Sequence, residues 1–113
     1  MATTTPTFSH LSRASAAGLA LLAVEIRAAR KERRMTEAEL AERAGCSRDT
    51  VRAIEAGKPT VAIGHVLEVA AILGLDLFGG TEATEARLGE VRSRLRLLPE
   101  RVRKPTARFD DDF

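Results

Sequence analysis

The sequence predicts an all-α protein with no substantial sheet. Aromatic residues make up 4% of the chain and neither Trp nor Tyr occurs, whereas Ala, Leu, Glu and Arg are abundant. Alanine and straight-chain residues lose little rotamer freedom in a helix, so this composition favours helix over strand. Apolar residues also recur three and four positions apart in several segments, which is the spacing of one helix face.

The length and charge of the chain limit the kinds of protein that it can form. The chain has 113 residues, 44% of them apolar, which suffices for one core with tails. The net charge of +2 conceals an uneven distribution, because the acidic residues 110–112 offset an Arg-rich remainder. The single cysteine, Cys46, cannot form an internal disulfide, which favours a cytoplasmic protein. Glu25 and Arg27 interrupt the apolar run at 14–29, so we expect no membrane segment.

Residues 1–13 are expected to form a flexible N-terminal arm, because they are rich in Thr and Ser and have no apolar period. Apolar positions then recur at helical spacing between Leu19 and Ile26. This first helix is expected to end near Arg34. We interpret residues 14–79 as one domain.

Two short helices are expected to meet across a tight turn in the middle of this domain. Thr36 and Glu39 have the spacing of a capping box at the start of the second helix, and Gly45 can end it in a left-handed conformation. Ser47 can then cap a third helix over 48–56.

A fourth helix is expected over 63–73, with its apolar positions forming one buried stripe. Leu75, Leu77 and Phe78 are expected to pack onto the core beyond its end. The predicted stripe consists of Ile63, Val66, Leu67, Ala70 and Leu73.

The glycine pair at 79–80 is interpreted as a hinge before a C-terminal helix over 80–98. This helix has apolar residues at alternating spacings of three and four, which is typical of a stripe that contacts a partner surface. The tail over 99–113 begins at a proline and is highly charged, so we expect it to be disordered. The stripe includes Leu88, Val91 and Leu95.

The segment 36–57 resembles the helix-turn-helix of the Cro and phage-repressor (XRE) family of regulators. The resemblance rests on a joint pattern of inward-facing apolar residues, a glycine at the turn, a serine cap and a closing Glu and Gly. In that family a lambda-repressor-like domain of five helices places its third helix in the major groove of double-stranded DNA. The resemblance therefore implies a five-helix domain, followed here by the extra C-terminal helix and flanked by flexible tails. The residues that match are Leu40, Ala41, Gly45, Ser47, Val51, Ile54, Glu55 and Gly57.

The resemblance also assigns roles to individual residues. Arg48 has donors that fit guanine and Asp49 can accept from cytosine, although Arg48 and Arg52 could equally contact phosphate or lie on a solvated face. The implied base-contacting positions are Arg48, Asp49, Arg52 and Ala53. The implied backbone-contacting positions are Thr36, Glu37, Ser47, Thr50, Lys58 and Thr60.

The family pattern also bears on one residue pair and on one position where this sequence departs from it. Arg30 and Glu55 fall where the family often has a salt bridge between the first helix and the end of the third, so we expect a structural pair. Glu37 departs from the family pattern, which usually has Gln here. A carboxylate can only accept hydrogen bonds and repels phosphate, so the usual contact from the second helix is in doubt.

Other chemistry finds little support in the sequence. It contains no phosphate-binding glycine loop, no cysteine or histidine pair at metal-ligand spacing and no nucleophile motif. We therefore expect no enzyme activity, no metal and no cofactor. Cys46 falls at a small and usually buried position of the turn, so we expect it to pack there rather than sense redox conditions.

Small XRE regulators with such a C-terminal extension resemble antitoxins that pair with HipA-type toxin kinases. A disordered tail ending in acidic residues and an aromatic could fold into a groove on a basic partner. Two other interpretations remain: the acidic end serves solubility, or the helical stripe is the seam of a dimer. The implied partner-binding residues are Leu88, Val91, Leu95, Phe109 and Phe113.

The sequence as a whole predicts a homodimeric repressor that binds a palindromic operator in double-stranded DNA and regulates its own operon as an antitoxin. The first alternative is a stand-alone XRE regulator without a toxin partner. The second is a protein-interaction adaptor that has kept the fold and lost DNA binding, as the carboxylates of Glu37 and Asp49 could indicate.

Overall fold

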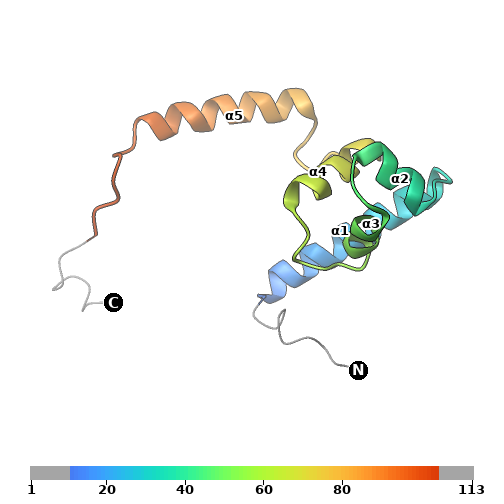
Figure 1. Cartoon of the computed structure of the whole chain (residues 1–113). Helices are drawn as coiled ribbons and strands as arrows, with labels where there is room; N and C mark the ends of the chain where they lie inside the picture. Colours follow the sequence, from blue (N-terminus) through green and yellow to red (C-terminus); the bar gives the residue numbers. More distant parts are fainter. Residues whose placement is uncertain (1–10, 105–113) are drawn as a thin grey trace. The chain divides into compact units, whose positions relative to one another are not determined.

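A computed structural model describes residues 11–104, and within this range the chain forms five helices and no strand (Figure 1). The all-α class predicted from the sequence is confirmed. The chain divides into two units, Met1–Leu77 and Phe78–Phe113. Four helices belong to the first unit and one to the second, whereas the family resemblance implied five in the domain and another beyond it.

Helix α1 (Arg13–Glu32) starts six residues earlier than the apolar period indicated. Ser12 caps it, because its hydroxyl accepts from the backbone N–H of Ser15 at 3.0 Å. The Ala-rich start of this helix has no polar face that would reveal a period. No helix of the described residues combines the length and the apolar character that a membrane span needs.

Helices α2 (Glu37–Ala44) and α3 (Arg48–Glu55) lie where the sequence predicts them. Thr36 and Glu39 form the expected capping box: the Glu39 N–H donates to Thr36 Oγ1 at 3.0 Å, and the Thr36 N–H donates to Glu39 Oε1 at 2.8 Å. Gly45 adopts the left-handed conformation at the end of α2, with φ of 71°.

Helix α4 (Ile63–Ile72) also has the expected extent, and the predicted stripe is confirmed in part: Ala70 and Leu73 are buried and Val66 packs against the core. Val69 is completely buried, whereas Ile63 is 74% exposed and Leu67 is 38% exposed. The helix is apolar nearly all round, so helical spacing alone cannot identify the side that packs against α2.

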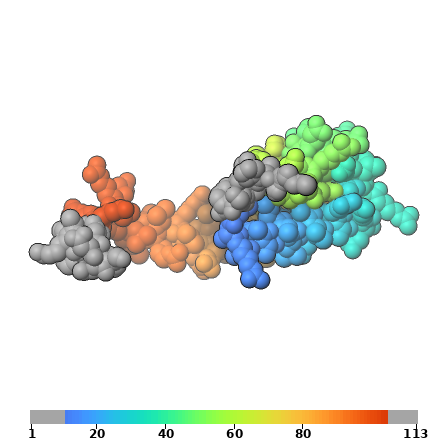
Figure 2. Space-filling model, turned by 90° about the horizontal axis from the view of Figure 1, so that it is seen from below, coloured from blue at the N-terminus to red at the C-terminus, as the bar shows by residue number. Residues whose placement is uncertain are grey.

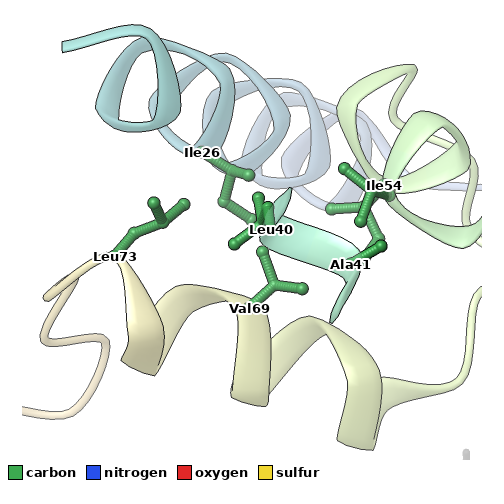
Figure 3. Packing of buried hydrophobic residues seen from close by; sticks show 7 residues of the cluster. Ile26, Leu40, Ala41, Ile54, Val69 and Leu73 are labelled. Carbon is green, nitrogen blue, oxygen red and sulfur yellow. The ribbon is translucent and has the colours of Figure 1, made fainter. Parts of the chain in front are cut away.

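All four helices of the first unit contribute to one core. Figure 3 shows side chains of α1, α2, α3 and α4 converging on Leu40 of α2, which is completely buried. Leu75 packs against this core after α4, as predicted. The prediction was wrong for Leu77 and Phe78, which are 39% and 67% exposed. The largest fully buried residues are Ile26, Leu40, Val51, Val69 and Leu73.

Helix α5 (Thr81–Arg96) belongs to the second unit and has no buried residue. Gly79 and Gly80 before it both have positive φ, which explains why glycine occupies the predicted hinge. The N–H of Thr84 and its hydroxyl both contact the carbonyl oxygen of Gly80, at 2.9 and 2.6 Å, which fastens the first turn. The arm predicted at 1–13 and the tail at 99–113 lie largely outside the described residues.

Candidate nucleic-acid interface

The turn between α2 and α3 fixes the direction in which α3 leaves it. The backbone N–H of Cys46 donates to the carbonyl oxygen of Ala41 at 3.0 Å, which closes the end of α2. Ser47 then caps α3 by accepting from the N–H of Thr50 at 3.0 Å, and the two hydroxyls are 2.9 Å apart. Two of the predicted backbone-contacting hydroxyls, those of Ser47 and Thr50, are therefore engaged within the protein at the start of α3.

Helix α3 presents one buried side and one exposed side. Val51 and Ile54 are buried against the other helices. Three of the four predicted base-contacting residues are exposed, and the fourth, Ala53, is half-buried. The exposed three are Arg48, Asp49 and Arg52.

A nearly buried ion pair holds the far end of α3 against α1. Arg30 donates to both carboxylate oxygens of Glu55, at 2.6 and 2.9 Å, and it also donates to the carbonyl oxygen of Met35 at 2.9 Å. The side chains of Arg30 and Glu55 are only 11% and 5% exposed. The hydrogen bond with Glu55 raises the pKa of Arg30 despite the opposing effect of burial. This pair therefore positions α3 and is not available to a ligand.

Glu37 is not a free negative charge facing the solvent. Its Oε1 accepts from Nε of Arg52 at 3.2 Å, which links the first turn of α2 to the middle of α3. The positive charge of Arg52 partly neutralises the Glu37 carboxylate. This reduces the repulsion of phosphate that we expected from Glu37. It also leaves the Arg52 side chain 53% exposed, so Arg52 still borders the outer side of α3.

A groove of about 620 Å³ lies beside the start of α3 and is lined mainly by cations. Arg27 and Lys31 of α1 lie one turn apart in its lining, together with Arg48 of α3 and the paired Arg30. Thr36, Glu37 and Ala38 at the start of α2 complete the lining, so the positive end of the α2 dipole also faces it. Such a surface attracts anions.

Arg27 and Lys31 were missed as site residues by sequence reasoning. Their spacing of four positions, just before the two short helices, was the available signal. The sequence alone did not indicate which of the several α1 cations would face α2 and α3.

Lys58 and Thr60 lie in the loop after α3, and both are exposed. The backbone N–H of Lys58 donates to the carbonyl oxygen of Ala53 at 3.0 Å, which attaches the loop to the end of α3. Both side chains thus remain available beside α3.

Cys46 packs against the core cluster. Burial raises the pKa of its thiol, which lowers the fraction of reactive thiolate. Within residues 11–104 no group of His, Cys, Asp or Glu side chains could hold a metal ion.

The predicted partner-binding residues fall in the second unit. Leu88 is 46% exposed and Leu95 is 63% exposed, while Val91 between them is half-buried. Phe109 and Phe113 lie outside the described residues.

Comparison with known families agrees with this geometry. Residues 26–79, slightly less than half of the chain, match the family model described as Helix-turn-helix. No curated protein and no solved structure matches the chain significantly. The match supports membership of the XRE family and indicates a DNA-binding transcriptional regulator. Residues 26–79 are therefore similar to the helix-turn-helix domains of that family.

Proposed function

We propose that this protein is a sequence-specific repressor that binds double-stranded DNA with the exposed side of α3 in the major groove. The observation that carries the proposal is the position of exposed Arg48, at the start of α3, on the wall of a groove shared with Arg27 and Lys31. A helix end with base-reading donors beside cations that neutralise phosphate is what major-groove recognition requires.

In this proposal the residues divide into two groups. Arg48 and Asp49 read base edges, with Arg52 and Ala53 one turn further along the helix. Arg27 and Lys31 join the backbone contacts, and Glu37 acts mainly by positioning Arg52. The remaining proposed backbone contacts are Thr36, Ser47, Thr50, Lys58 and Thr60.

The proposed binding unit is a homodimer on a palindromic operator. One recognition helix contacts only a few base pairs, so a single copy would bind weakly. Two copies related by a twofold axis double the contacts and require half-sites about one helical turn apart.

Selection of binding sites from a pool of random duplexes tests this function. The full-length chain should enrich a palindromic sequence with G·C pairs in each half-site. Its affinity for the selected duplex, measured by fluorescence anisotropy, should fall steeply as salt increases, because phosphate contacts release counterions. Lack of enrichment together with salt-independent binding would favour the adaptor that has lost DNA binding.

A protein partner at the C-terminal region is the second part of the proposal. Helix α5 has no buried residue and exposes Leu88 and Leu95 between arginines, which suits a helix that contacts another protein. We propose that this surface, with Phe109 and Phe113 of the tail, binds a toxin of the HipA kinase type, and that the protein is the antitoxin that represses the shared operon.

A capture experiment from the native host tests the partner. Full-length bait and bait truncated after Gly80 should differ by one stoichiometric kinase-like protein, retained only by the full-length chain. If neither bait captures a protein partner, a stand-alone XRE regulator is the better account.

A further inference from the structure

Glu37 is the one carboxylate among the described residues that line the groove beside the start of α3, which we call the cationic groove. Figure 2 shows the surface of α3, in green, beside that of α1, in blue, and both helices contribute cations to this groove. A carboxylate cannot donate to phosphate and, even when partly neutralised by Arg52, it opposes phosphate binding. Its hydrogen-bond partner Arg52 lies outside the groove lining.

The contact between Glu37 and Arg52 restrains one part of the guanidinium and leaves the rest free. Nε of Arg52 donates to Oε1 of Glu37 at 3.2 Å, and no other hydrogen bond involves this side chain within residues 11–104. The two terminal nitrogens therefore retain four N–H donors. Glu37 is the inner partner, with its side chain 25% exposed, and Arg52 is the outer one. An arginine held through Nε still presents the two-nitrogen fork that matches O6 and N7 of guanine.

We propose that Glu37 is a specificity-determining residue that positions Arg52 to read a guanine and lowers the affinity of the cationic groove for unrelated DNA. The inference rests on the proposed function, because it requires α3 to lie in the major groove. A free arginine loses much rotamer freedom when it binds a base, and a restrained one loses less. Both effects of Glu37 favour the operator over other sequences.

Arg52 and Arg48 are expected to read different base pairs. Both are exposed on α3 and lie four residues apart, so they occupy the same side of the helix. Four residues advance about 6 Å along a helix axis, whereas neighbouring base pairs are about 3.4 Å apart. Removing Glu37 should therefore alter the preference at the Arg52 base pair of each half-site and leave the preference at the Arg48 base pair unchanged.

Fluorescence anisotropy with a set of duplexes tests the positioning role. Each duplex carries one base-pair change in the operator that the full-length wild type selects. Arg52→Ala should lose discrimination of about tenfold or more at one base pair of each half-site. Glu37→Ala should lose about threefold or more at the same base pair, and it should have no further effect there in the Arg52→Ala background.

Glu42→Ala is the matched control for the loss of a carboxylate from α2. Glu42 is exposed and lies outside the lining of the cationic groove. This variant should leave the preference at every base pair unchanged. If Glu37→Ala weakens binding to all duplexes alike, or leaves discrimination at the Arg52 base pair intact, the positioning role is wrong.

The conservative variant Glu37→Gln separates the two effects. Its amide oxygen can still accept from Arg52, so discrimination at the Arg52 base pair should persist. Loss of the negative charge should raise the affinity for the operator and for an unrelated duplex alike, and should steepen the dependence of log K on log salt by about 1. Unchanged affinity for the unrelated duplex would contradict the second effect.

The same experiment distinguishes failure of this inference from failure of the proposed function. If the wild type selects an operator but Glu37→Ala changes no single base-pair preference, the inference fails and the proposed function stands. If the wild type selects no operator, the proposed function fails and the inference fails with it.

Discussion

Arg30 of α1 and Glu55, the last residue of α3, form a two-pronged ion pair with N···O distances of 2.6 and 2.9 Å. The pair fixes the C-terminal end of α3, while the Ser47 cap fixes its start. Two separate interactions therefore set the angle of α3, which has eight residues and is too short to be stable alone.

Loss of this pair should destabilise the domain strongly. Glu55→Ala should lower the free energy of unfolding by about 3 kcal/mol, because it leaves the Arg30 charge nearly buried and without its partner. Glu37→Ala is the control, since its contact with Arg52 is more exposed, and it should cost less than about 1 kcal/mol. Urea denaturation measures both, and equal effects would contradict the structural role of the Arg30–Glu55 pair.

The capping box should give α2 a specific dependence on pH. Hydrogen bonds from the backbone N–H and the side chain of Thr36 lower the pKa of Glu39 below its ordinary value of 4.5. A lowered pKa in the folded state means that the stabilisation is complete above the ordinary pKa and is lost as pH falls through the folded pKa. NMR titration should show the pKa of Glu39 returning toward 4.5 in Thr36→Pro, which removes both the hydroxyl and the backbone N–H. An unchanged pKa in that variant would show that the cap does not cause the shift.

Helix α4 lacks a side-chain cap, because its N-cap residue is Ala62. Ala62→Asp should therefore raise the free energy of unfolding by about 1 kcal/mol, since the carboxylate can accept from a free N–H and also interacts favourably with the helix dipole. Ala38→Asp in the first turn of α2, which is already capped by Thr36, is the control and should stabilise less, because it adds the dipole interaction without a new cap. Thermal or urea unfolding distinguishes the two variants.

Arg34 is the single residue other than glycine with positive φ in the described part of the chain, at 56°. Glycine adopts this conformation without steric cost, so Arg34→Gly should stabilise the fold by about 0.5 kcal/mol. Lys31→Gly, inside α1, should instead destabilise by about 1 kcal/mol. If both glycines destabilise equally, the left-handed conformation at Arg34 does not limit stability.

The parts of the fold that depend on local chemistry could be predicted from the sequence. The caps of α2 and α3 involve residues only a few positions apart, so their spacing was sufficient to predict them. Thr36 and Glu39 cap the start of α2, Gly45 ends it and Ser47 caps α3. The Arg30–Glu55 pairing came from family resemblance, because no local pattern joins residues 25 positions apart.

The parts that depend on tertiary contacts could not be predicted in the same way. Val69 and Leu67 are both apolar and lie on the same helix, and the contact with α2 decides that Val69 is the buried one. Likewise, the spacing of Arg27 and Lys31 does not by itself indicate that they share a groove with Arg48. The start of α1 was missed for another reason: an Ala-rich segment has high helix propensity but no period.

We propose that α3 reads bases while the neighbouring cations contact phosphate, and the most direct test compares Arg48→Ala with Lys58→Ala by fluorescence anisotropy. On the selected operator, Arg48→Ala should cost about 1 to 3 kcal/mol and should lose little on an unrelated duplex. Lys58→Ala should weaken binding to both duplexes alike. Equal, small losses for both variants on both duplexes would contradict the assignment of α3 as the recognition helix.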